Sequence, residues 1–325
     1  QFIGELKGLK FNIAITANTL DTDIRSIKKA ARKGIKEELS KRIEEIISKK
    51  EITLDKENKI IWKKEKIAKL KKGYNYLTPE IEIITDDSLD NDLKIKLELF
   101  LKNWLKKYLK EILGDLINLT KVKIDNQYLR ALSFQLYEQN GVIKREIINN
   151  IVKLIPEDER KKLWSMGVKI GRYHIYLPKM LKPKAVTFRI SLWKLFYNLS
   201  NSHEIPQSGL NFLNENSYND KFMLLCGFEK FKEFFVRIDI LEKLFIKIIE
   251  KTKDKKIIIN TEMMNLLGCS RENFHKLMII MNYKKEKEPD SYVYKGNKKN
   301  KRDKKFFKST NKENPFNKLA TLNLK

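Results

Sequence analysis

The sequence predicts a mainly α-helical protein with small β elements: a helical accessory body, then a winged-helix-like domain, then a disordered basic tail. Three observations predict this class. Long stretches repeat apolar residues every three or four positions, the period of a helix with one buried face. Between them, short runs alternate apolar and polar residues, as strands do. In residues 295–325, 11 residues are basic and two are acidic, which is typical of disordered chain.

Residues 1–87 indicate a mixed α/β segment. Residues 9–16 alternate and predict a strand. Asp21 can cap a long helix whose apolar positions recur as far as Ile46. A turn at Lys72 and Gly73 separates the strands that follow. These short strands are expected at residues 52–54, 59–62, 66–70 and 80–85.

Residues 88–200 indicate a helical domain. The strongest helical pattern of the chain begins at Ser88 or Asp90 and continues to Ile117. Pro156 suits the first turn of a later helix, and Gly167 suits its C-terminal end. Further helices are expected at residues 125–139, 142–154 and 156–166.

The segment 167–199 interleaves basic and aromatic residues around two prolines. Such a surface suits a nucleic-acid strand, because rings stack on bases and cations meet phosphates. The alternative is a strand and a helix whose aromatic rings are core and whose lysines are solvated. The candidate contacts are Arg172, His174, Lys179, Lys182 and Lys184, set among Tyr173, Tyr176 and Trp193.

Residues 201–236 indicate a linker and then, over residues 222–236, a stretch with strand character. Residues 237–295 carry the signals of a winged helix. Ser270 can cap the third of its helices, and the hairpin can turn at Glu288, Pro289 and Asp290. The expected elements are helices at residues 238–250, 261–267 and 271–281 and a hairpin at residues 283–294.

The third helix of a winged helix can enter a groove of nucleic acid. Its outward residues and the hairpin then supply the contacts. The alternative is a domain that serves only to pack against its neighbours. The candidate contacts are Arg271, His275, Lys276, Lys284 and Lys285.

Composition indicates a polyanionic partner. The net charge is +26 with a pI of about 9.7, a field that attracts RNA, DNA or an anionic surface. Lys, Ile and Asn are abundant everywhere, so AT-rich codon usage explains part of this charge. The tail at residues 296–325 is harder to explain in that way, because acidic residues nearly disappear there.

The chain is expected to be cytoplasmic. Cys226 and Cys269 lie far apart and match no ligand spacing, which suits a reducing compartment. No apolar run approaches the roughly 18 residues of a membrane span, so no membrane contact is expected. The first residue is Gln1 rather than Met, and we expect a piece of a longer polypeptide.

Motifs for catalysis are absent from the sequence. It contains no G-x-x-x-x-G-K-[ST], H-E-x-x-H, G-x-S-x-G or C-x-x-C. His174, His203 and His275 are scattered, so each is expected to be a structural or surface residue. The sequence therefore predicts no catalytic residue, metal site or cofactor in this chain itself.

Several stretches together resemble one family. The most specific is MGVKIGRYHIYLPKMLKPKAVTFRISLW, and IGELKGLKF, KIIWKKEKIAKLKKGYNYLTPEIEII, VRIDILEKLF, MMNLLGCSRENFHKLMIIMNYK and NPFNKLATL add to it. They resemble the region downstream of the motor core in alphaproteobacterial DExH-box superfamily 2 helicases, the group related to the mitochondrial degradosome RNA helicase. The similar stretches span nearly the whole chain.

The resemblance implies an ATP-dependent helicase as the parent protein. Its P-loop and DExH box would lie upstream, so ATP and Mg²⁺ are expected for that motor and not for this chain, which should be inactive alone. The partners implied are the helicase core in cis and a nucleic acid, RNA ahead of DNA. Two alternatives stay open: a free-standing winged-helix DNA-binding regulator without enzymatic activity, and an interaction scaffold whose charge reflects codon bias.

Overall fold

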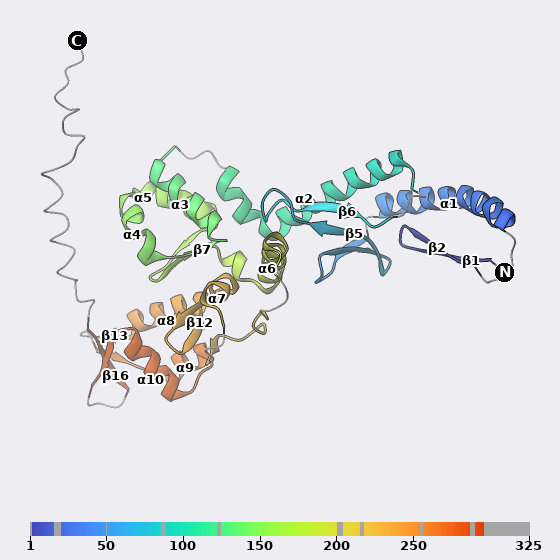
Figure 1. The fold of residues 1–325 in the computed structure, drawn as a ribbon. Coiled ribbons are helices and arrows are strands. Elements are labelled where there is room, and N and C mark those ends of the chain that lie inside the picture. Colours follow the sequence, from blue (N-terminus) through green and yellow to red (C-terminus); the bar gives the residue numbers. More distant parts are fainter. Residues whose placement is uncertain are drawn as a thin grey trace, which may run out of the picture. The chain divides into compact units, whose positions relative to one another are not determined.

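The computed structural model describes residues 2–15, 21–49, 51–85, 89–121, 125–199, 204–214, 218–253, 256–286 and 290–295. It confirms a mainly helical chain with small antiparallel sheets (Figure 1). The expected basic tail, residues 296–325, lies outside these residues. Among the described helices, none has the length and apolar character that crossing a membrane requires.

The chain divides into two compact units. One comprises residues 1–245 with 266–268, and the other comprises residues 246–265 and 269 onward. The division falls inside a helix, between residues 245 and 246, whereas the winged-helix-like domain was expected to begin at residue 237. The finer five-part division expected from the sequence stays a prediction.

The first unit begins with a hairpin rather than with one strand. Strand β1 (Phe2–Lys7) pairs with β2 (Lys10–Ile15) around Gly8, whose φ of 60° suits a residue without a side chain. Helix α1 (Asp21–Lys49) begins at Asp21, the residue that was expected to cap it, so its start lies within one residue of the expected one. In the part of α1 whose side chains are described, it buries the expected apolar positions, Ile35, Leu39, Ile43 and Ile46.

A four-stranded antiparallel sheet follows, in the order β3-β4-β5-β6, close to the expected boundaries. Helix α2 contacts β6 and α1, and it is interrupted at Leu113, whose φ of −113° and ψ of 16° are not helical. Gly114, a weak helix former, comes next. The bounds are β3 (Ile52–Leu54), β4 (Lys59–Trp62), β5 (Glu65–Lys71), β6 (Glu80–Ile83) and α2 (Asn91–Lys121).

The helical part of the first unit contains a small sheet, β7-β9-β8, which the sequence did not predict. Figure 1 shows α3, α4 and α5 gathered near β7. The prediction of one helix over residues 142–154 is wrong at its start, because β7 pairs with β9 and the helix begins after it. The bounds are α3 (Gln127–Glu138), β7 (Val142–Lys144), α4 (Arg145–Leu154), α5 (Glu157–Ser165), β8 (Lys169–Ile170) and β9 (His174–Tyr176).

The rest of the first unit corrects a second prediction. Residues 222–236 were expected to have strand character, but Asn219 caps a helix, α7, that ends at Gly227 with φ of 91°. Only the two strands after it, β11 and β12, pair as expected. The bounds are η1 (Pro178–Leu181), α6 (Pro183–Tyr197), β10 (Phe212–Leu213), α7 (Asp220–Cys226), β11 (Phe228–Phe231), β12 (Phe234–Arg237) and α8 (Ile238–Lys251).

The second unit contains the end of α8, most of α9, helix α10 and a four-stranded antiparallel sheet ordered β13-β14-β16-β15. Ser270 caps α10 as expected and accepts a hydrogen bond from the Asn273 backbone N–H at 3.3 Å. Strands β13 and β14 were not predicted. The bounds are β13 (Thr252–Lys253), β14 (Lys256–Ile258), α9 (Thr261–Leu267), α10 (Arg271–Ile280), β15 (Tyr283–Lys285) and β16 (Ser291–Tyr294).

One hydrophobic core in the first unit extends from Leu9 to Leu192. Beside it lies Arg189 of α6, which is fully buried and forms no ion pair with a described residue. Its guanidinium donates hydrogen bonds to three carbonyls: those of Asn140, Met180 (3.2 Å) and Leu225 (2.7 Å). Burial lowers the pKa of Arg189 to about 10, so the charge is retained at neutral pH.

Replacement of Arg189 by Met should destabilise the first unit strongly. The substitution keeps an unbranched side chain but leaves two buried carbonyls and one partly buried carbonyl without their donor, so we expect a loss of about 3 kcal/mol or more in unfolding free energy. Urea denaturation followed by circular dichroism measures it. Arg130→Met, at an exposed position of α3, is the matched control and should change stability by less than about 0.5 kcal/mol. Equal stability of the two variants would contradict the assigned role.

Candidate nucleic-acid interface

The segment 167–184 is built on two glycines. Gly167 ends α5 with φ of 83°, a left-handed conformation that side chains disfavour. At Gly171 the constraint is space, because an added Cβ would lie 2.3 Å from the carboxylate carbon of Glu242. The glycine therefore allows Glu242 to reach the backbone of the turn that follows.

Glu242 organises that turn. Its carboxylate on α8 accepts backbone N–H hydrogen bonds from Arg172 (2.6 Å), Tyr173 (2.8 Å) and His174 (2.9 Å). Glu242 itself is buried, with 6% of its surface exposed. A buried carboxylate requires such donors, so these contacts fix the turn at one position against α8.

His174 completes a buried network on the other side of the turn. Its Nε2 lies 2.9 Å from Oε2 of Glu229 on β11, and Lys144 donates to the second oxygen of Glu229. Burial alone would lower the pKa of His174, but its hydrogen bond to Glu229 and the negative charges of Glu229 and Glu242 outweigh burial and raise it. Burial by itself would raise the pKa of each carboxyl, yet the partner groups hold both below their usual value.

The sequence did not predict Glu229 or Glu242. A signal for Glu242 was present, because it sits in the apolar stripe of α8 that includes Ile238, Leu241 and Phe245, at helical spacing. A carboxylate inside such a stripe indicates a buried polar contact. Among the described residues, no three His, Cys, Asp or Glu side chains form a group that could hold a metal ion.

Four of the five candidate residues in this segment are at the surface, and two of them pair with α2. Arg172, Lys179, Lys182 and Lys184 are exposed, whereas His174 is buried and does not face solvent. Lys179 lies 3.0 Å from Asp115, and Lys184 lies 3.2 Å from Glu111. The four cations therefore lie on one stretch of chain, but acidic residues of α2 balance the charges of Lys179 and Lys184.

The aromatic residues of the segment lie in packed positions, as the alternative interpretation expected. Tyr176 is 4% exposed, and burial raises its pKa to about 12. Tyr173 meets Phe245 edge-on at 5.7 Å between ring centroids, and Trp193 lies 5.5 Å from Tyr197. These rings pack against other side chains of the protein. The exposed cations of the segment therefore remain as the candidate contacts for nucleic acid.

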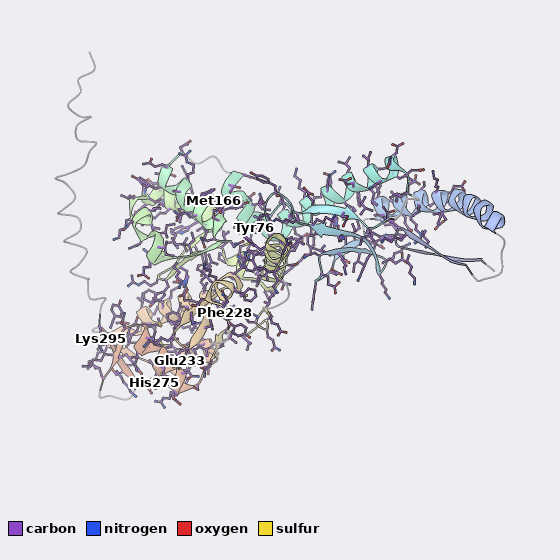
Figure 2. The ribbon with its side chains drawn as sticks, viewed as in Figure 1. Tyr76, Met166, Phe228, Glu233, His275 and Lys295 are labelled. Carbon is purple, nitrogen blue, oxygen red and sulfur yellow. The ribbon has the colours of Figure 1, made fainter. Side chains whose placement is uncertain are left out.

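In the second unit, Asp290 brings two of the five candidate residues together. Arg271 forms an ion pair with it, and Nε2 of His275 lies 3.5 Å from its Oδ1. His275, labelled in Figure 2, also stacks on Tyr292, and burial with the charge of Lys285 lowers its pKa. The Arg271 guanidinium lowers the pKa of Asp290.

The remaining candidates of this unit are exposed. Lys276 lies 2.9 Å from Glu272 on the same helix, α10. Lys284 and Lys285 of β15 are exposed and form no ion pair with a described residue. Lys287 and Pro289, in the predicted turn, lie outside the described residues. The basic surface of this unit therefore combines the start of α10 with β15.

No protein family, curated protein or solved structure matches the chain.

Replacement of Glu242 by Gln should destabilise the first unit. The amide keeps one acceptor oxygen but turns an N–H₂ group toward one of the backbone N–H groups, so we expect a loss of about 2 kcal/mol in unfolding free energy. Chemical denaturation measures the change. Glu250→Gln, at an exposed position of the same helix, is the control and should be nearly neutral. A neutral Glu242→Gln would exclude the carboxylate as the organiser of the turn.

The buried network should also make stability depend on pH, in two opposite directions. His174 has a raised pKa, so its contribution is complete below its ordinary value of 6.5 and is lost as the pH rises through the raised value. The lowered pKa values of Glu229 and Glu242 give a contribution that is complete above their ordinary value of 4.5 and is lost as the pH falls below it.

We therefore expect this network to stabilise the chain most between about pH 5 and 6.5, with a decline toward alkaline pH. Thermal unfolding measured from pH 5.5 to 9 tests the decline. His174→Gln should remove most of it, although the variant will be less stable at every pH. The same alkaline decline in both proteins would show that another group causes it.

Proposed function

We propose that this chain is the nucleic-acid-binding accessory part of an ATP-dependent helicase whose motor domains are encoded upstream. The observation that carries the proposal is the sequence of elements around α9 and α10. Residues 268–270 join these helices in a three-residue turn that contains Gly268 with φ of 68°. Helix-turn-helix motifs use a short turn of this kind, and their second helix enters the major groove.

The neighbouring strands support a winged-helix interpretation. Helix α8 and β14 precede the two helices, and β15 and β16 follow them as a hairpin. Strand β16 lies between β14 and β15, so the hairpin is joined to the strand that precedes α9. In this interpretation α10 and β15 form the contact surface, with Arg271, Lys276, Lys284 and Lys285 exposed on it.

Charge supports a nucleic acid as the partner. The net charge is +26, and residues 296–325 alone carry ten basic and two acidic residues. Phosphate contacts made by lysine and arginine release counterions, which gives binding a steep dependence on salt. We place RNA ahead of DNA because of the resemblance to a degradosome-related helicase group.

The motor part of the proposal rests on that resemblance. The chain contains no P-loop and no DExH box, so ATP and Mg²⁺ would bind upstream and the chain alone should not hydrolyse ATP. In the cytoplasm the chain would hold the unwound strand for that motor. The coding sequence ahead of Gln1 tests this directly: an in-frame P-loop and DExH box support the helicase, and a start codon near Gln1 with no motor overturns it.

Replacement of Arg172, Lys179, Lys182 and Lys184 together by Ala should weaken binding to single-stranded RNA. Its salt slope should fall by roughly 0.7 for each phosphate that these side chains no longer neutralise. Fluorescence anisotropy of a labelled strand, titrated at several salt concentrations, gives both quantities. The matched control replaces four exposed lysines elsewhere in the first unit: Lys41, Lys64, Lys94 and Lys153. An equal change in both variants would mean that binding depends only on the net positive charge of the chain. This segment would then not be part of the binding surface.

A further inference from the structure

The first unit contains a groove along α2 that the sequence did not predict. It encloses about 430 Å³, within the size range of small-ligand pockets. The loop between β5 and β6 and helix α3 contribute to its lining along with α2. Its apolar lining residues are Leu77, Pro79, Leu105, Leu109, Ile117 and Tyr137.

The polar part of the groove is positively charged. Four lysines line it, Lys102, Lys106, Lys110 and Lys121, and none of its lining residues is acidic. Lys102 lies 2.6 Å from Glu98, so its charge is balanced. The other three lysines are exposed and form no ion pair with a described residue. Positive charge without a partner therefore borders an apolar floor, which favours a ligand with an apolar body and negative charge.

The positions of the three unpaired lysines along the groove indicate which class of ligand fits it. Lys106 and Lys110 are one turn apart, about 6 Å along the helix axis, and Lys121 follows on the same element, near its C-terminal end. The interruption at Leu113 lies between Lys110 and Lys121. A fatty acid carries one charge and would need the cations at one end. Cations distributed along a groove instead match a polymer with a charge on every unit.

We propose that this groove binds single-stranded nucleic acid, with bases on the apolar floor beside Tyr137 and phosphates at Lys106, Lys110 and Lys121. The inference rests on the proposed nucleic-acid binding and adds a site whose lining residues are not among the candidates found in the sequence. Bases stack on aromatic side chains with little sequence preference, so the groove would accept any strand. The basic residues 296–325 are unsuited to it, because their charge has the same sign.

The test compares two triple variants of the full chain. Lys106→Ala/Lys110→Ala/Lys121→Ala removes the groove cations, and Lys94→Ala/Lys96→Ala/Lys107→Ala removes three exposed lysines of α2 that do not line it. The probe is a fluorescein-labelled oligouridylate of about 15 nucleotides. The groove variant should bind about tenfold more weakly at low salt, with a salt slope smaller by about 2, and the control should change much less.

A second pair of variants tests the aromatic contact. Tyr137→Leu keeps the groove apolar but removes the ring, and Tyr128→Leu is the matched change on the same helix, α3. Without one stacked base, Tyr137→Leu should bind the strand about tenfold more weakly with an unchanged salt slope, and Tyr128→Leu should bind as the unmodified chain does. If Tyr137→Leu and Tyr128→Leu bind the strand equally well, Tyr137 does not contact a base.

The outcomes separate this inference from the proposed function. If the unmodified chain binds no strand, the proposed nucleic-acid function fails. If it binds and the two lysine variants weaken equally, the groove inference fails and the proposed function stands. If the groove variant keeps its affinity for the strand but no longer binds a labelled peptide of alternating Leu and Glu, the occupant is an acidic peptide and the inference is overturned.

Discussion

The carboxylate of Glu242 is the interaction on which much of the first unit depends. A charged group in the interior is tolerated only where hydrogen-bond donors surround it, and here three successive backbone N–H groups do so. The imidazole of His174 lies close by, with its Nδ1 3.8 Å from the carboxylate. This requirement explains why residue 171 is glycine, because an added Cβ would collide with the carboxylate. It also leaves the side chain of Arg172 exposed, so a buried acid determines where one candidate binding cation lies.

Arg189 imposes a similar constraint elsewhere in the same unit. It joins three segments of the chain by donating hydrogen bonds to one carbonyl oxygen in each. Tyr76, labelled in Figure 2, lies near enough that the charge of Arg189 acts to lower its pKa, although burial dominates and raises it. Segments far apart in the sequence thus meet at defined positions because a buried charge needs hydrogen-bond partners.

Composition alone suggests a uniformly basic surface, but in the structure several of the basic candidate residues have an acidic neighbour. Lys179, Lys184, Lys276 and Arg271 were all candidate contacts, yet each has an acidic neighbour in the structure. Exposed ion pairs are weak, so these residues can still meet phosphates, but each contact must first displace a neighbour. Exposed lysines that form no ion pair with a described residue include Lys182, Lys284 and Lys285 of β15, and the three unpaired groove lysines of α2.

The sequence by itself determined the mainly helical class, the start of α1 at Asp21, the capping of α10 by Ser270 and the hairpin after it. These features depend on periodicity and on contacts within about one helical turn, so local residues suffice. Only the tertiary structure decided that Val142 begins a strand, that Tyr176 and His174 are buried, and that a groove lies along α2. Each of those depends on residues far apart in the chain, as with Glu242 and the backbone it meets about 70 positions earlier.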